Sequence, residues 1–100
     1  MAVVLQKVFV SLQSLMPTII AHLEMAYPTL FDDATYSLHE QGKGLIGLNL
    51  HSDKYPSTLF WIDERLDVRP AYRSRYTEEQ RQLDSKLKTN ISELLKRAIV

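Results

Sequence analysis

The sequence predicts a single α+β domain, a two-layer sandwich in which a three-stranded antiparallel meander packs against two amphipathic helices. Two observations carry this prediction: apolar residues recur with a helical period near both ends of the chain, and with a period of two between them. With 100 residues, of which 45% are apolar and 24% charged, the chain can build one hydrophobic core and is too short for two. Residues 1–100 are therefore expected to form one domain, in the order helix, three strands, helix.

The first helix is predicted by a stripe of apolar residues whose spacing fits one buried helix face. The stripe occupies positions 5, 8, 9, 12, 15, 16, 19, 20 and 23. It keeps its phase across Pro17, which favours one kinked helix, although Ser14 could instead cap a second segment. Pro28 follows closely, so the helix is expected to end before it.

Three strands are predicted beyond a turn at Asp32 and Asp33, where apolar and polar residues begin to alternate; they span residues 35–41, 45–51 and 58–68. A three-residue hairpin loop at 42–44 would pair Leu38 with Leu48, whereas a two-residue loop would pair apolar residues with polar ones. We favour the three-residue loop, since its glycines also supply the positive φ that hairpin loops need.

The second helix is predicted to begin after Thr77, a residue type that caps helix starts, and to run to about Ile99. Glu78 and Glu79 place negative charge at the positive end of the helix dipole. The helix carries one apolar stripe, formed by Leu83, Leu87, Ile91, Leu94, Leu95 and Ala98. This stripe is expected to pack on the sheet of its own chain, with a dimer contact as the alternative.

If both helices lie on one face of the sheet, the opposite face is left open. A large aromatic side chain on such a face is usually covered by something, and Trp61 lies there. We therefore expect a dimer or partner interface centred on Trp61, with Leu45, Leu59 and Asn49 around it; packing of Trp61 within the monomer is the alternative. If Leu50 pairs with Phe60, the rows across this face are Ser37, Asn49 and Trp61, followed by His39, Gly47 and Asp63.

Charge is unevenly distributed along a chain whose formal net charge is zero. Residues 1–41 hold one cation and four anions, whereas all six arginines lie from Arg65 onward. Within residues 65–81 arginines are interleaved with tyrosines, a composition that suits single-stranded nucleic acid or another phosphate-bearing ligand. The alternative is a solvated corner in which these arginines pair with neighbouring carboxylates. The candidate binding residues are Arg69, Tyr72, Arg73, Arg75 and Tyr76.

An enzyme is the least favoured function class. His39 and Asp63, facing each other across Gly47, could orient an imidazole as a general base beside the hydroxyl of Ser37. Such side chains more often occur on strand faces as solvated residues. No histidine pair has the spacing of a metal site, no nucleotide-binding glycine motif occurs, and the chain has no cysteine. We therefore expect no catalytic set, no metal and no cofactor.

The N-terminal apolar stretch is interrupted by polar residues and lacks the basic start of a signal peptide, so neither export nor a membrane anchor is expected. The absence of cysteine agrees with the cytoplasm. The sequence therefore predicts a small, non-enzymatic, cytoplasmic interaction or regulatory module, such as an adaptor, inhibitor or assembly factor. It is expected to form a homodimer and to bind a protein partner; binding of nucleic acid or another phosphoanion is the alternative.

Overall fold

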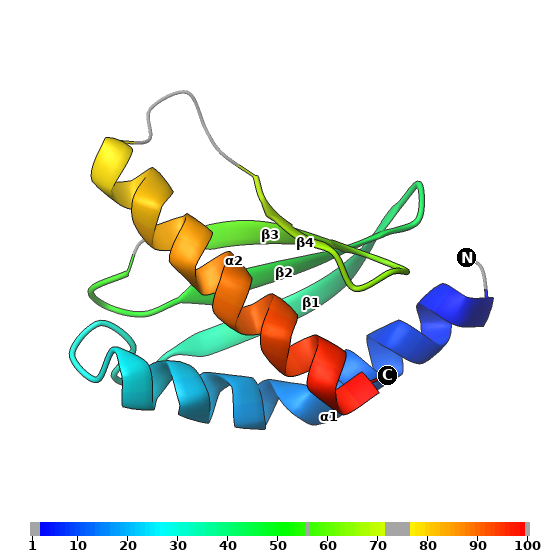
Figure 1. Cartoon of the computed structure of the whole chain (residues 1–100), viewed down its shortest axis with the longest axis horizontal. Helices are drawn as coiled ribbons and strands as arrows, with labels where there is room; N and C mark the ends of the chain where they lie inside the picture. Colours follow the sequence, from blue (N-terminus) through cyan, green and yellow to red (C-terminus); the bar gives the residue numbers. More distant parts are fainter. Residues whose placement is uncertain (1–2, 56, 72–76, 100) are drawn as a thin grey trace.

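The computed structural model describes residues 3–55, 57–71 and 77–99. In chain order its elements are α1 (Val3–Ala26), β1 (Thr35–Gly42), β2 (Leu45–His51), β3 (Thr58–Asp63), β4 (Val68–Pro70) and α2 (Glu78–Ile99) (Figure 1). The strands form one antiparallel sheet in which β1, β2, β3 and β4 lie side by side in sequence order. The predicted α+β class, with a helix before and after the strands, is therefore confirmed.

The helix α1 follows the predicted stripe. Pro17 lies inside the helix and is exposed, and the helix continues past it to Ala26. Figure 1 shows one continuous but bent helix, as expected where a proline removes a backbone hydrogen bond. The side chains that the stripe sends into the core are Leu5, Val8, Leu12, Met16, Ile19 and Leu23.

The hairpin between β1 and β2 has the predicted register, with Leu38 opposite Leu48. Its loop differs in detail, because Gly42 pairs with Leu45 and a bulge precedes it. The turn itself is therefore Lys43 and Gly44, whose φ angles of 55° and 74° are the positive values that a two-residue hairpin turn requires. The bulge places one extra residue in β1 before the two-residue turn. The side chains of β1 therefore lie on the same faces that the three-residue loop predicted.

The prediction of three strands is wrong, because the predicted strand 58–68 divides into β3 and β4. A tight turn separates the two strands, and the side chain of Asp63 closes it. Its Oδ1 accepts hydrogen bonds from the backbone N–H groups of Arg65 at 2.9 Å and Asp67 at 3.1 Å. Leu66 adopts a positive φ of 65° in this turn and buries its side chain. The chain therefore reverses direction without interrupting the core.

The predicted pairing of Leu50 with Phe60 is also wrong. Leu50 lies opposite Thr58, and Phe60 lies opposite Leu48, a shift of two residues. Because side chains alternate with a period of two, this shift leaves each residue on its predicted face and changes only its neighbours. The row across the strands that contains Trp61 is therefore a different one.

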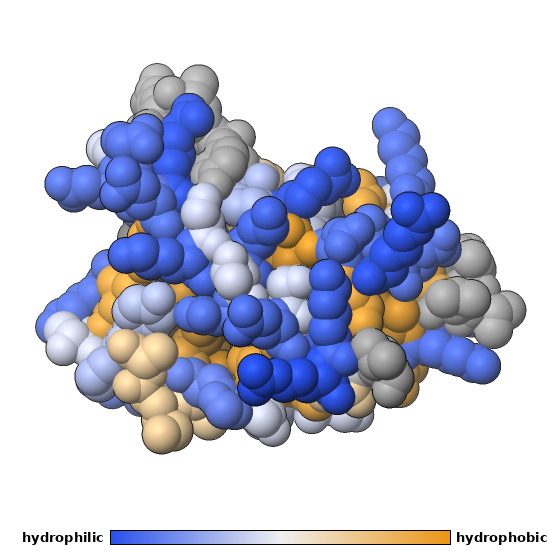
Figure 2. All heavy atoms as spheres, in the orientation of Figure 1, coloured by the Kyte–Doolittle hydropathy of each residue, from blue (hydrophilic) through white to orange (hydrophobic). Residues whose placement is uncertain are grey.

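One buried cluster joins both helices to a single face of the sheet. The helix α2 crosses in front of the sheet in Figure 1, and the side of the molecule that carries the helices is largely hydrophilic on its surface in Figure 2. Both predicted stripes are thus used inside the chain. The buried apolar side chains from the strands and α2 are Ile46, Leu48, Leu50, Phe60, Ile62, Val68, Leu87, Ile91 and Leu95.

Candidate functional site

The face of the sheet opposite the core is the candidate site, and we call it the open face. Along β2 and β3 the side chains of the core face are fully buried, whereas the alternating ones on the other side are half-buried, apart from Gly47, which is buried, and His51, which is exposed. Predicted contact residues and their neighbours therefore lie together on one surface. The open face comprises Ser37, His39, Leu45, Gly47, Asn49, Leu59 and Trp61.

The centre of the open face is a row formed by His39, Gly47 and Trp61 on adjacent strands. The rings of His39 and Trp61 meet edge to face across Gly47, with centroids 6.5 Å apart. This arrangement depends on glycine, since a Cβ at position 47 would lie 2.3 Å from Cε1 of His39. The missing side chain thus lets the imidazole lie over β2 and contact the indole.

The other predicted contact residues surround this row. Asn49 pairs with Leu59 one step along the strands, and Leu45 lies diagonally from Trp61. All four predicted side chains are half-buried. The structure therefore brings Leu45, Asn49, Leu59 and Trp61 together as one mixed apolar and amide surface.

The predicted arrangement of His39 with Asp63 is not present. Asp63 lies opposite Leu45, and Trp61 occupies the place in the His39 row that Asp63 was expected to fill. The carboxylate of Asp63 closes the β3–β4 turn, while Nε2 of His39 lies 3.1 Å from Oε1 of Gln41. Ser37, the third residue of that hypothesis, is exposed and lies opposite Asn49.

The arginine- and tyrosine-rich segment is only partly described. Arg69 is exposed on β4 and lies opposite Trp61, whereas Tyr72, Arg73, Arg75 and Tyr76 lie outside the described residues. Arg69 also borders a groove between β4 and α2. The groove is lined by Asp67, Val68, Arg69, Lys88, Thr89, Ser92, Glu93 and Lys96.

A buried polar cluster beneath the other face was not predicted. The hydroxyl of Tyr55 donates to Oδ1 of Asp84 over 2.7 Å, and the side-chain amide of Gln80 donates to the same oxygen over 3.0 Å. Asp84 is fully buried, and its Oδ2 has no hydrogen-bond partner among the described residues. Burial raises the pKa of Asp84 above its ordinary value, and the hydrogen bonds from Tyr55 and Gln80 act in the opposite direction.

The sequence contained a signal for this cluster. Asp84 lies three residues before Leu87, within the apolar stripe of α2, so the helix was bound to bury it. Tyr55 lies between the predicted strands 45–51 and 58–68, where a loop is expected, yet it is fully buried and its ring packs on Phe31 with centroids 5.0 Å apart. The backbone N–H of Tyr55 is held by the hydroxyl of Ser52, which itself donates to the carbonyl of Leu30.

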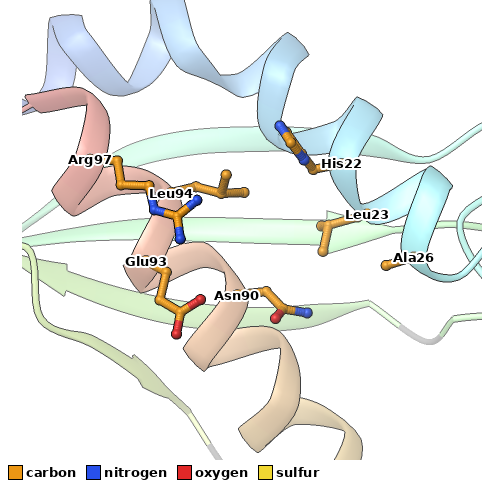
Figure 3. A pocket seen from close by; sticks show the side chains of 7 residues that line it. All are labelled: His22, Leu23, Ala26, Asn90, Glu93, Leu94 and Arg97. Carbon is orange, nitrogen blue, oxygen red and sulfur yellow. The ribbon is translucent and has the colours of Figure 1, made fainter.

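A pocket between the two helices is another concave feature near charged side chains (Figure 3). Its volume of about 230 Å³ is smaller than that of most sites for small molecules. His22 comes from α1, whereas Glu93 and Arg97 come from α2 at the opposite side of the pocket. The remaining lining residues are Leu23, Ala26, Asn90 and Leu94.

No group of three metal-ligating side chains occurs within the part of the chain that the structure describes. By length and composition, the segment Leu5–Ala26 is apolar enough to cross a membrane. The core helix of a soluble protein passes the same test, and α1 contributes six buried side chains to the core.

Comparison of the chain with protein-family models, with curated proteins and with solved structures found no match.

Proposed function

We propose that this chain is a small protein-interaction module, homodimeric and cytoplasmic, that binds a protein partner through the open face around Trp61. In this proposal the fold acts as a two-layer sandwich: the helices complete the core on one side of the sheet, and the other side is left for the partner. An adaptor, an inhibitor or an assembly factor would work in this way, without chemistry of its own.

The half-buried state of Trp61 is the observation that carries the proposal. Tryptophan is enriched among the residues that dominate binding energies, and it is effective when a partner removes its remaining surface from water. Trp61 lies next to Leu59 and diagonally from Leu45 on the same face, and the ring of His39 meets it across Gly47. A partner could therefore cover a continuous surface formed by these side chains.

The core supports the same conclusion, because it is complete without the open face. Eighteen apolar side chains of the described residues form the buried cluster, and Trp61, Leu45 and Leu59 are not among them. Their conversion to polar residues is thus expected to reduce the free energy of unfolding by less than the corresponding changes on the core face. Binding and folding can be separated by mutation.

The proposal is tested by photo-crosslinking in the cells that produce the protein. Benzoylphenylalanine is placed at Leu59 on the open face and, as the matched control, at Met25, an apolar residue of α1 that is 83% exposed. We expect a discrete protein adduct from position 59 and none from position 25. The change Trp61→Ala in the position-59 background should abolish that adduct while circular dichroism shows an unchanged fold.

Adducts of equal yield at both positions, or an adduct at position 59 that survives Trp61→Ala, would contradict a partner site on the open face. Mass spectrometry of the adduct distinguishes a second copy of the chain from another protein.

A second candidate function is the binding of nucleic acid or another phosphoanion. The groove between β4 and α2 favours it, because three cations line this groove. Arg69 belongs to the arginine-rich segment 65–81, and Lys88 and Lys96 come from α2. Asp67, which also lines it, lies 3.8 Å from Lys96 in a solvent-exposed ion pair of little energetic weight. Titration of labelled single-stranded RNA at low and high salt tests this function, since phosphate binding weakens steeply with salt.

A further inference from the structure

The strand β1 is the exposed edge of the sheet. The opposite edge, β4, is only three residues long and ends in a proline, whereas β1 runs for eight residues. Six of the eight residues of β1 are exposed and the other two are half-buried. Long edge strands of this kind present unpaired backbone groups that can pair with another strand.

The direction of these backbone groups follows from hydrogen bonds on the far side of the sheet. The N–H of Asp63 donates to the carbonyl of Asp67 at 3.2 Å, and the carbonyl of Leu59 accepts from the N–H of Ala71 at 2.8 Å. Both bonds point away from β2. Because the N–H and C=O of one strand residue point to the same side, the odd-numbered residues of β3 bond away from β2 and the even-numbered ones bond toward it.

The register carries this alternation across to β1. Even-numbered residues pair with even-numbered residues from β3 to β2 and from β2 to β1 as far as the bulge. The even-numbered residues of β2 therefore bond to β3, and its odd-numbered residues bond to β1. It follows that Tyr36, Leu38 and Glu40 direct their N–H and C=O groups outward, and no hydrogen bond among the described residues reaches them.

The helix α1 contacts β1 and runs near this edge of the sheet (Figure 1). Phe9 and Ile20 are eleven residues apart and share one side of α1, and Tyr27 directly follows the helix; all three pack against the buried core. All three are half-buried. On β1 itself, Leu38 is half-buried and Tyr36 is 40% exposed. The edge thus combines free backbone groups with apolar side chains.

We infer that a second copy of this chain pairs with β1 in antiparallel orientation across a two-fold axis at Leu38, which joins two four-stranded sheets into one of eight strands. This inference deepens the proposed function, since it places the homodimer contact at the edge and leaves the open face of each copy for another partner.

The side chains of β1 are complementary to themselves in this register. Tyr36 lies opposite the partner's Glu40, and Ser37 lies opposite the partner's His39, so no charge meets a like charge. A two-fold axis at Glu40 would place two carboxylates side by side, which destabilises a strand pair. The axis at Leu38 instead puts the one aliphatic side chain of the strand at the centre and uses all three outward-facing residues.

Charge at the two ends of β1 selects a second copy over an unrelated strand. Asp32 and Asp33 precede the strand, and Lys43 follows it in the hairpin turn; all three are exposed. Antiparallel pairing brings Lys43 of each copy close to Asp33 of the other. The two-fold axis repeats this contact, so the dimer gains two ion pairs of opposite charge.

Charge reversal tests the orientation. In Lys43→Asp, and separately in Asp33→Lys, both contacts between identical copies become repulsive, while a mixed dimer of the two variants has two attractive contacts. By sedimentation equilibrium at low salt, we expect each variant alone to dimerise about tenfold more weakly than the natural sequence. The equimolar mixture should recover most of this loss. A dimer that is insensitive to both changes, or a chain that stays monomeric, overturns the inference.

Backbone pairing is tested by the matched pair Glu40→Pro and Glu40→Ala. Both remove the carboxylate, but only proline removes the outward N–H, and it leaves the β1–β2 hydrogen bonds in place. We expect the proline variant to dimerise at least about tenfold more weakly than the alanine variant, with the same circular dichroism spectrum. Equal dimerisation of the two variants overturns the inference.

Acrylamide quenching of Trp61, the only tryptophan, separates this inference from the proposed function. In an edge-to-edge dimer the quenching should not change with protein concentration. Shielding of Trp61 on dimerisation overturns the edge contact and moves the dimer to the open face. Failure of the open face to bind another protein leaves the sedimentation result unaffected.

Discussion

Replacing Tyr55 with phenylalanine removes one oxygen atom from the core and leaves the ring in contact with Phe31. The hydroxyl donates to Oδ1 of Asp84 over 2.7 Å, and both residues are fully buried. A hydrogen bond to a charged group contributes about 1.5–3 kcal/mol, and one between neutral groups about 1 kcal/mol. Because Oδ2 of Asp84 has no partner among the described residues, the remaining carboxylate would be poorly satisfied. We expect Tyr55→Phe to lower the free energy of unfolding by about 2 kcal/mol at neutral pH.

The loss should depend on pH, because burial raises the pKa of Asp84 and the Tyr55 hydrogen bond opposes that rise. A carboxyl whose pKa is higher in the folded than in the unfolded state makes the protein less stable as pH rises from 3.8 through the folded pKa. The variant lacks one hydrogen bond that lowers the pKa, so its stability should continue to fall to higher pH. The difference between the two proteins is therefore about 1 kcal/mol near pH 4 and about 2 kcal/mol near pH 7.

The assay is urea unfolding followed by far-ultraviolet circular dichroism at both pH values. For a domain of this size the neutral-pH loss corresponds to a decrease in Tm of about 8–16 °C. Asp84→Asn is the matched control, since it removes the titrating group and should abolish the pH dependence of this difference. An equal loss at both pH values, or no loss at either, would refute the assignment of Asp84 as a buried carboxylate held by Tyr55.

Three further changes test the packing of the sheet and the start of α2. Gly47→Ala should lower the free energy of unfolding by about 1–3 kcal/mol, because the new Cβ would lie 2.3 Å from the His39 ring. The two-dimensional NMR spectrum should show that the His39 ring is displaced, and an unmoved ring would contradict the close approach. Thr77→Ala should cost about 1 kcal/mol in urea unfolding, since its Oγ1 accepts from the N–H of Gln80 at 3.1 Å, and Thr77→Ser should restore most of it. Leu48→Ala should cost about 2–5 kcal/mol, because this side chain is fully buried at the centre of the sheet, and a loss under about 1 kcal/mol would show that the core is not closed there.

The helices and the first hairpin were predictable because several signals agree there. The stripe of α1 persists through Pro17, Thr77 caps α2 as its sequence indicates, and the period of two on either side of the hairpin allows only a register that keeps Leu38 with Leu48. Gly44 in the turn and Gly42 directly before it both adopt positive φ. Local propensity and burial thus favour the same structure.

The pairing of β2 with β3 was not predictable for a physical reason. The connection between the strands is too long to determine a register, and a shift of two residues keeps every apolar side chain on the core face. The Leu48–Phe60 and Leu50–Phe60 pairings therefore look alike in the sequence. This ambiguity placed Asp63, instead of Trp61, beside His39.

The β3–β4 turn and the cluster of Tyr55, Gln80 and Asp84 were not predicted from the sequence, because side-chain hydrogen bonds form them. Nothing in the apolar pattern shows that Asp63 accepts two backbone N–H groups, or that Leu66 adopts a positive φ. Asp84 could have been noticed as a carboxylate within an apolar stripe, but its partner Tyr55 is 29 residues away in the chain. Long-range polar pairs of this kind follow from the fold and do not specify it beforehand.

The position of α2 after all four strands has a consequence for synthesis. The sheet can form its hairpins from neighbouring segments, but the apolar face that they create is covered in part by Leu87, Ile91 and Leu95, which are translated after the strands. A chain that is still attached to the ribosome and has been made only as far as β4 therefore exposes uncovered core to solvent or to a chaperone. The stable fold becomes available only when α2 has emerged and can pack against α1.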